Sequence, residues 1–321
     1  MATAVSSSVF SCDKNAKIVF FAPRDKKYEE FECVDRHSPV KILKSIKKCD
    51  VFILGGGTLI SEEASTRSAY YYTAILWLAN MMKKRCVIWS GGIDHIRSKL
   101  LKKLLKKPLK NAKLSLRDTA SLDSLWDICP CAKAKVHADA VFLLAGGRTP
   151  SSALRKHLAV CVKNGCPADL GVMVGDFCQK HSLIPVFVAT SPRDMAECER
   201  QSALSGGVSI LLRDLEDAKA VFETSALCLS MRYHAILLSA CFGCVPISMS
   251  DSQKVLALMR EMSLGELILP LAYSYQKYES TLEKALLSIE KHRQTCQEEV
   301  KKMLRRANLA EAFFMDIKRL L

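Results

Sequence analysis

The feature that most constrains the fold is a regular alternation of short apolar runs with longer amphipathic ones. Short apolar runs predict buried strands, and longer amphipathic stretches predict helices. The predicted strands are 17–22, 51–54, 86–89, 112–116, 135–138, 158–162, 184–188, 208–211, 226–229 and 245–248. The predicted helices are 39–48, 68–83, a basic helix that stops near Pro108, a short helix after Asp118, then 167–181, 193–204, 213–223, 232–242 and the chain from about Ser280. This order favours an α/β fold with parallel sheets.

The segment 146–152, Gly-Gly-Arg-Thr-Pro-Ser-Ser, is a cluster of breakers between two such patterns. We therefore predict two Rossmann-like domains, 1–147 and 153–321, in a chain of 321 residues. Two such domains facing each other leave a cleft between the carboxyl ends of their strands, where ligands bind in folds of this kind.

The formal net charge of +14 favours polyanionic partners, which include nucleic acid, an anionic membrane and substrates that carry phosphate or carboxylate. Charge alone does not choose among the three. Because the sequence contains no nucleic-acid recognition motif, we do not expect a nucleic-acid partner.

Several of the 14 cysteines lie within apolar runs, as small core residues do in a reducing compartment. Cys129 and Cys131 lack the spacing and the second pair of a zinc site, so we expect no metal and no cofactor. The chain has no apolar stretch near the ~18 residues that span a bilayer. Residues 1–15 lack the basic start of a signal peptide, so we expect a cytoplasmic protein.

A strongly basic segment, 97–110, also carries leucines at helical spacing. Such a helix could rest on an anionic leaflet at the inner face of a membrane. The preferred interpretation is an amphipathic helix that packs its leucines on the sheet and exposes its lysines.

The sharpest motif is Ser230-Met231-Arg232-Tyr233-His234, which follows an apolar strand and opens an apolar helix. Anions are favoured at a helix amino terminus, and a guanidinium forks onto carboxylate or phosphate. An imidazole two residues later can donate a proton. The alternative, an arginine that caps a neighbouring element and a histidine satisfied in the interior, stays open.

A second group follows the strand 51–54. The glycines Gly55, Gly56 and Gly57 could bring the backbone close to a phosphate or a sugar, although a tight strand-to-helix turn is the commoner explanation. Glu62 and Arg67 belong to a polar and aromatic cluster downstream, which a capped and solvated helix start would explain equally well.

Taken in order, these motifs resemble the polysaccharide pyruvyl transferases. The resemblance rests on G-G-G-T-L-I-S-E at 55–62, S-x-R-S at 65–68, a tyrosine pair at 71–72, R-D at 117–118, H-A-D at 137–139, and M-R-Y-H-A at 231–235 with Gly243 and V-P at 245–246. It covers roughly 50–264, about two thirds of the chain.

This resemblance implies a GT-B-like fold and phosphoenolpyruvate (PEP) as the donor to a glycan or lipid-linked sugar of the cell surface or cell wall. Arg232, Tyr233 and Lys163 would bind PEP, and His234 would be the catalytic acid. Lys163 stands where the family has an arginine, and lysine keeps the charge without the bidentate fork. The acceptor residues would be Gly55, Gly56, Gly57, Glu62, Arg67 and Arg117.

The family's opening glycine-rich loop is not evident, so we expect the first β-α unit of the acceptor domain to be missing. Two alternatives stay open. One is a nucleotide-sugar-dependent GT-B glycosyltransferase, for which Glu62 is the candidate carboxylate. The other is a degenerate, non-catalytic member that binds glycans.

Overall fold

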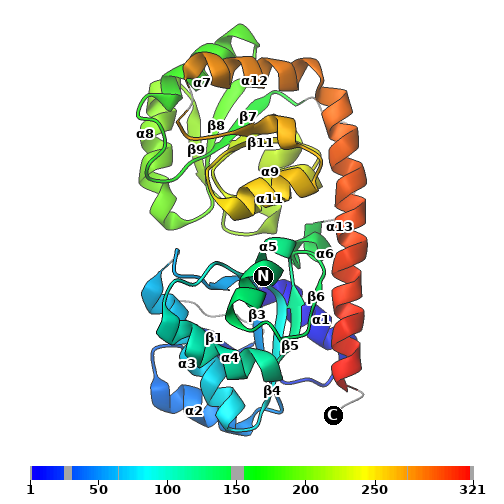
Figure 1. Cartoon of the computed structure of the whole chain (residues 1–321). Coiled ribbons are helices and arrows are strands. Elements are labelled where there is room, and N and C mark those ends of the chain that lie inside the picture. The colour runs from blue at the N-terminus through cyan, green and yellow to red at the C-terminus, as the bar shows by residue number, and fades with distance from the viewer. Residues whose placement is uncertain (1, 25–30, 64, 146–154, 273, 319–321) are drawn as a thin grey trace. The chain divides into compact units, whose positions relative to one another are not determined.

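The structure, a computed structural model, describes residues 2–24, 31–63, 65–145, 155–272 and 274–318. The chain forms two compact units (Figure 1). Unit 1 consists of Met1–Leu143 together with Arg305–Leu321, and unit 2 is Leu144–Leu304. The predicted second domain, 153–321, therefore ends with a segment that groups with unit 1. The predicted linker, 146–152, lies outside the described residues.

Unit 1 contains a four-stranded parallel sheet in the order β3-β4-β5-β6 and a separate parallel pair, β1-β2. The strands are β1 (Val19–Ala22), β2 (Glu32–Asp35), β3 (Val51–Ile60), β4 (Arg85–Ile93), β5 (Lys113–Leu116) and β6 (Ala134–Val136). The helices are α1 (Ala2–Cys12), α2 (Pro39–Lys48), α3 (Thr66–Met81), α4 (Lys99–Asn111) and α5 (Thr119–Ile128). Helix α6 (Val141–Ala145) begins in unit 1 and ends in unit 2. The core lies between the apolar faces of the helices and the sheet.

Unit 2 contains a six-stranded parallel sheet in the order β12-β11-β10-β7-β8-β9. Its strands are β7 (His157–Cys161), β8 (Ile184–Ala189), β9 (Val208–Leu211), β10 (Ser225–Ser230), β11 (Val245–Met249) and β12 (Ile268–Leu269). Its helices are α7 (Leu170–Lys180), η1 (Pro192–Asp194), α8 (Met195–Ser205), α9 (Leu215–Thr224), α10 (Tyr233–Cys241), α11 (Gln253–Glu261), η2 (Gly265–Leu267) and α12 (Tyr275–Leu287). The last helix, α13 (Ile289–Lys318), begins in unit 2 and ends in unit 1.

The glycine segments of unit 1 correct two predictions, because β3 and β4 continue through them where turns were expected. Gly57 pairs with Gly91, and Thr58 pairs with Gly92. Gly56 and Gly57 both have a φ of 73°, in the left-handed region that glycine adopts at little cost, and the register shifts between Thr58 and Ile60.

Helix α4 also differs from its prediction, since it continues through Pro108 to Asn111. Leu105, Pro108 and Leu109 are all buried, so packing of the apolar face compensates for the hydrogen bond that proline cannot donate. The sequence patterns also missed α1, β2, α6, α11 and β12, which are short or lack clear periodicity. Among the described residues, no helix combines the length and the apolar character that a bilayer span requires.

Candidate functional site

The motif around Arg232 lies at a topological switch point of the unit 2 sheet. From β7 the chain proceeds to β8 and β9 on one side, whereas β10 pairs with the other side of β7. Met231 N donates to Cys161 O at 2.9 Å, so the residues that follow β10 emerge beside those that follow β7. The crevice at such a point is where open parallel sheets bind their ligands.

The backbone of Arg232 is fixed at the start of helix α10. Ser230 Oγ accepts a hydrogen bond from Arg232 N at 2.9 Å and donates one to Arg232 O at 3.1 Å. Arg232 is the residue that precedes the helix, with extended backbone angles. Amide groups of the first helical turn have no partners within the helix, so this end favours an anion.

The guanidinium of Arg232 is only partly engaged by the protein. Its Nη2 donates to Asp194 Oδ1, and Asp194 follows β8 at the same edge of the sheet. The Arg232 side chain is 34% exposed, while that of Asp194 is 4% exposed. Within the described part of the chain, Arg232 Nε and Asp194 Oδ2 are buried without a hydrogen-bond partner. Since a buried polar atom without a partner is costly, the pair is suited to gain a ligand.

Lys163 follows β7 by two residues and is half-buried. It opens a tight turn in which Cys166 N donates to Lys163 O at 3.2 Å and Gly165 has a φ of 89°. This turn brings Lys163 to the carboxyl edge of β7, the strand that pairs with β10. Arg232 and Lys163 therefore follow neighbouring strands.

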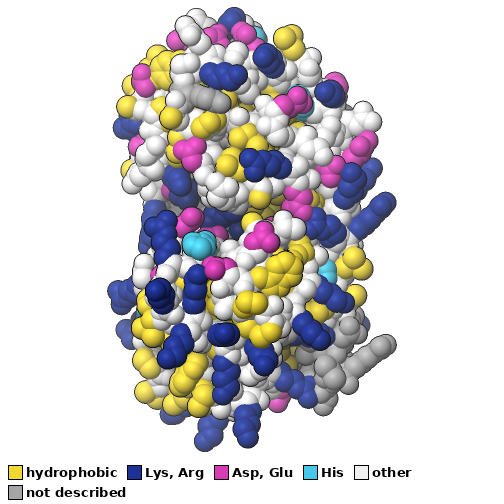
Figure 2. Space-filling model, in the orientation of Figure 1, with side chains coloured by type: hydrophobic (Ala, Val, Ile, Leu, Met, Phe, Trp, Pro, Cys, Tyr) yellow, Lys and Arg dark blue, Asp and Glu magenta, His cyan; other side chains and the backbone are white. Residues whose placement is uncertain are grey.

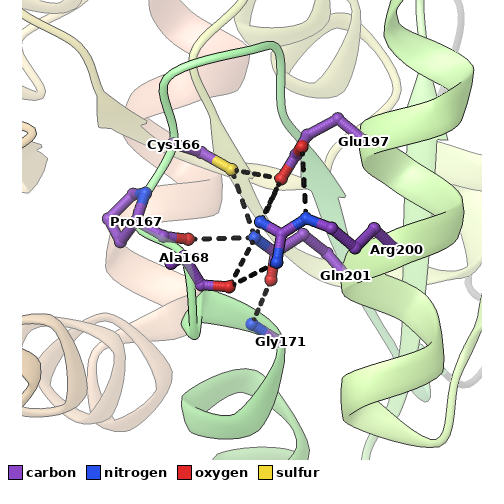
Figure 3. Close-up of polar contacts among 7 residues, drawn as sticks. All are labelled: Cys166, Pro167, Ala168, Gly171, Glu197, Arg200 and Gln201. Atoms are coloured by element: carbon purple, nitrogen blue, oxygen red, sulfur yellow. Dashed lines mark hydrogen bonds and ion pairs between the residues drawn. The ribbon is translucent and has the colours of Figure 1, made fainter.

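A polar network shown in Figure 3 holds the segment after this turn against α8. Gln201, fully buried, donates from Nε2 to Pro167 O at 2.9 Å and accepts at Oε1 from Gly171 N at 2.6 Å. Arg200 Nη1 donates to Ala168 O at 2.7 Å. The network fixes the path from β7 to α7, so it indirectly positions Lys163.

A thiol is part of the same network. Cys166 Sγ donates to Glu197 Oε1 at 3.0 Å. Burial, followed by the hydrogen bond and the negative charge of Glu197, raises the pKa of Cys166 to about 12. A thiol with such a pKa stays protonated at neutral pH, so Cys166 serves as a hydrogen-bond donor and not as a nucleophile.

Tyr233 and His234 form the first residues of α10, and both are half-buried. Their rings meet edge to face, with centroids 5.4 Å apart and planes at 87°. Ser248, near the end of β11, is fully buried at the neighbouring strand, and its Oγ has no hydrogen-bond partner in the described chain. Imidazole, guanidinium and ammonium groups thus follow adjacent strands of one sheet, and the Ser248 hydroxyl lies near the end of the next strand.

Arg117, a predicted acceptor residue, is buried in unit 1, unlike the partly exposed Arg232. Its side chain is 2% exposed, and its guanidinium donates to Thr58 Oγ1 at 2.7 Å and to Asp118 Oδ2 at 2.9 Å. Asp139 Oδ2 lies 3.7 Å from Nη1. A side chain added at Gly92 would come within 2.8 Å of the Arg117 Cζ atom. Arg117 therefore ties the strand ends of unit 1 together, and its acceptor role stays a prediction.

The glycines and Glu62 also have partners in unit 1. A side chain at Gly55 would lie 3.1 Å from Val5 Cγ2 of α1, so Gly55 permits close helix packing. Glu62 Oε2 accepts from the backbone amides of Arg97 and Ser98, the latter at 3.2 Å, at the start of α4. Gly56 and Gly57 lie within β3, and Arg67 is exposed in the first turn of α3. An acceptor role for these residues stays a prediction.

Sequence reasoning missed Asp194 and Gln201 as parts of the site. Asp194 could have been predicted from the sequence, because it follows a predicted strand, β8, whose carboxyl end lies at the edge that carries Arg232. Gln201 could not have been predicted, since a glutamine in a helix carries no mark of what it contacts. Within the described residues no group of three or more metal-ligating side chains is present. A hollow of about 430 Å³ between α7 and α8 contains none of the predicted site residues.

Comparison with solved structures identifies the fold. UDP-GlcNAc 2-epimerase from Neisseria meningitidis, bound to UDP-GlcNAc, matches with a TM-score of 0.67 and 10% identity over 98% of this chain and 96% of that one. A putative UDP-N-acetylglucosamine 2-epimerase from Listeria monocytogenes matches with a TM-score of 0.64 and 12% identity over 97% and 91%. Anabaena HepE, in complex with UDP and glucose, matches with a TM-score of 0.65 and 10% identity over 99% and 95%. The predicted GT-B-like α/β fold is confirmed.

A search of curated proteins gives no match. The family model for polysaccharide pyruvyl transferase matches residues 10–253, which is more than half of the chain and includes both the glycine strands and the Arg232 motif. The chain therefore belongs to the polysaccharide pyruvyl transferase family.

Proposed function

We propose that this protein transfers the pyruvyl carbons of PEP to a sugar of a cell-surface or cell-wall glycan, forming a cyclic ketal. The observation that carries the proposal is the partly engaged Arg232 at the switch point, with a buried Nε that lacks a partner in the described chain. PEP carries a phosphate and a carboxylate, and both match a guanidinium fork and a helix amino terminus.

Each group has a defined task in the reaction. Arg232 binds an anionic group of PEP through Nε and the side of its guanidinium that faces away from Asp194. Asp194 holds the guanidinium in place by accepting from Nη2. Lys163 adds a second positive charge beside the neighbouring strand, and the backbone at Tyr233 helps to hold the donor. A fixed cationic site of this kind stabilises charge that develops on the departing phosphate.

His234 supplies the proton. Protonation of the methylene carbon of PEP leaves a cation at the adjacent carbon, which one sugar hydroxyl attacks. The first hydroxyl loses its proton to His234 as it adds, and the bond to phosphate then breaks. A second hydroxyl of the same sugar attacks this carbon, and its proton passes to the departing phosphate. The net reaction converts PEP and a sugar diol into a ketal and inorganic phosphate, and the acid step needs one positioned proton donor.

The competing donor is a nucleotide sugar, since the similar solved structures include complexes with UDP. Such a donor needs a carboxylate that grips the ribose or acts as a base. The candidate for that role, Glu62, uses Oε2 to cap the start of α4. This assignment of Glu62 favours PEP. The mass-spectrometric assay described next also distinguishes the alternative in which the protein binds glycans without catalysis.

The proposal is tested by mass spectrometry of candidate glycans and lipid-linked sugars incubated with the protein and PEP. Ketal formation adds ~70 Da to the acceptor in a step that requires the acid. The matched control omits PEP. A gain that appears with a UDP-sugar in place of PEP would support the glycosyltransferase, and no gain with either donor would support the glycan-binding alternative.

A further inference from the structure

The positive charge of the chain is concentrated in unit 1. Unit 1 has 29 lysines and arginines against 16 aspartates and glutamates, whereas unit 2 has 18 against 17. Nearly all of the net charge of +14 therefore belongs to the unit that does not contain Arg232 and His234. The proposed donor site does not account for this excess.

Three helices carry much of the excess. Helices α2, α3 and α4 contain ten lysines and one arginine, and none of their residues is acidic. On α2 and α4 the apolar faces are buried in the core, with Leu101, Leu105 and Leu109 fully inaccessible. The lysines consequently face solvent. The exposed ones are Lys41, Lys44, Lys47, Lys48, Lys99, Lys103, Lys106, Lys107 and Lys110.

This burial agrees with the preferred interpretation of the segment 97–110, in which its leucines pack on the sheet. Leu101, Leu105 and Leu109 lie in the core, whereas Leu100 is exposed. The lysine face of α4 remains accessible. Lys102 is the half-buried lysine of α4, and its Nζ donates to Asp127 Oδ2 of α5 at 2.7 Å.

Large apolar side chains lie exposed among these lysines. Trp77 and Met81, one turn apart on α3, are 41% and 53% exposed. Leu43 of α2 and Leu100 of α4 are also exposed. Figure 2 shows dark-blue and yellow side chains mixed over the part of unit 1 that carries these helices, with little magenta.

Direct contacts hold the three helices next to one another. Tyr70 of α3 and Ser98 at the start of α4 share a hydrogen bond of 3.0 Å. Lys84, just after α3, donates from Nζ to Lys47 O and Cys49 O at the end of α2, both at 2.8 Å.

We propose that helices α2, α3 and α4 form a surface that binds an anionic lipid bilayer. Lysine ammonium groups are attracted to anionic headgroups without any defined geometry, and tryptophan favours the boundary between headgroups and acyl chains. A nucleic-acid surface would favour arginine forks and base-stacking aromatic rings. The ratio of ten lysines to one arginine favours the bilayer.

The inference goes beyond the proposed function, because it concerns unit 1 and needs no PEP. The test is co-sedimentation of the full chain with vesicles of phosphatidylcholine, with and without phosphatidylglycerol. We expect binding only when phosphatidylglycerol is present, and weaker binding as salt is raised. The triple variant Lys47→Glu, Lys103→Glu, Lys107→Glu should bind at least about tenfold more weakly.

The matched control applies the same charge change to exposed lysines of unit 2, as Lys156→Glu, Lys291→Glu, Lys301→Glu. This control should bind vesicles almost as well as the wild type. Trp77→Ser should weaken binding while leaving its salt dependence unchanged. Equal loss in both triple variants would overturn the proposal, as would tighter binding to duplex DNA than to the anionic vesicles. Ketal transfer to a soluble glycan should persist in the unit 1 variant, so failure of this proposal is distinct from failure of the proposed function.

Discussion

The carboxyl edges of the two sheets each contain an arginine beside an aspartate, and the two arginines differ in what remains available to a ligand. In unit 1, Arg117 is 2% exposed and has Thr58, Asp118 and Asp139 around its guanidinium. In unit 2, Arg232 is 34% exposed and its guanidinium contacts Asp194 while Nε lacks a described partner. An arginine saturated by its own protein stabilises the fold, and one engaged on a single side can bind an anion.

The two histidines near these edges give the largest expected contrast. His234→Asn should lower the rate of transfer by about 10²–10⁴-fold, because an amide cannot donate the proton. His137→Asn should leave the rate nearly unchanged, because His137 is buried in unit 1 and shares a 2.8 Å hydrogen bond with Ser115 Oγ. Steady-state rates of both variants and circular dichroism of both proteins test this. Near-normal transfer by His234→Asn would exclude His234 as the acid.

The arginines should separate ligand binding from stability. Arg232→Lys should weaken PEP binding by about 10- to 150-fold, which corresponds to the roughly 1.5–3 kcal/mol of a hydrogen bond to a charged group. Arg117→Lys should lower the free energy of unfolding by about 1–3 kcal/mol with PEP affinity unchanged, since Thr58 and Asp118 lose their donors. PEP titrations and urea unfolding of both variants give the comparison. The reverse pattern would mean that the donor site lies in unit 1.

Lys163 should have a smaller effect than Arg232, because it is a half-buried point charge without a fork. Lys163→Ala should raise the Michaelis constant for PEP by roughly 2- to 12-fold, as expected for a contact of about 0.5–1.5 kcal/mol. Lys163→Arg should match or improve on the wild type. If Lys163→Ala changes neither this constant nor the turnover, Lys163 is outside the donor site.

The smallest effect concerns pH. Burial, aided by the positive charges of Lys135 and Arg306, lowers the pKa of His137 in the folded protein. The unfolded chain therefore takes up a proton first as pH falls below about 6.5, and the free energy of unfolding should decrease from that point toward the folded pKa. Burial also lowers the pKa of His292 in unit 2, so this histidine likewise decreases the free energy of unfolding as pH falls. Urea unfolding between about pH 5 and 8 should show a shallower slope for His137→Asn, and an unchanged slope would exclude His137 as a source.

The sequence predicted the features that local patterns determine. Strand β9 and helix α2 have the predicted bounds, because apolar periodicity and a proline at the helix start mark them clearly. The Arg232 motif was correctly placed between a strand and a helix, since a buried strand and an apolar helix adjoin it in sequence.

Features that depend on residues far apart in the chain could not be predicted from the sequence. Asp194 is 38 positions from Arg232, and Thr58 is 59 positions from Arg117, so neither pairing leaves a local pattern. The same limit explains the glycines of β3 and β4, which were predicted as turns. Their continuation as strands depends on pairing between Gly57 and Gly91, which only the folded sheet brings together.

The central claim is that the edge of unit 2 around Arg232 binds PEP, and calorimetry with PEP and with UDP tests it most directly. We expect saturable binding of PEP to the wild type and no comparable binding of UDP. We also expect loss of the PEP signal in the double variant Arg232→Ala, Asp194→Asn, which avoids leaving a buried, unpaired carboxylate. Binding of UDP without PEP, or PEP binding that survives in a folded double variant, would exclude a PEP site at Arg232.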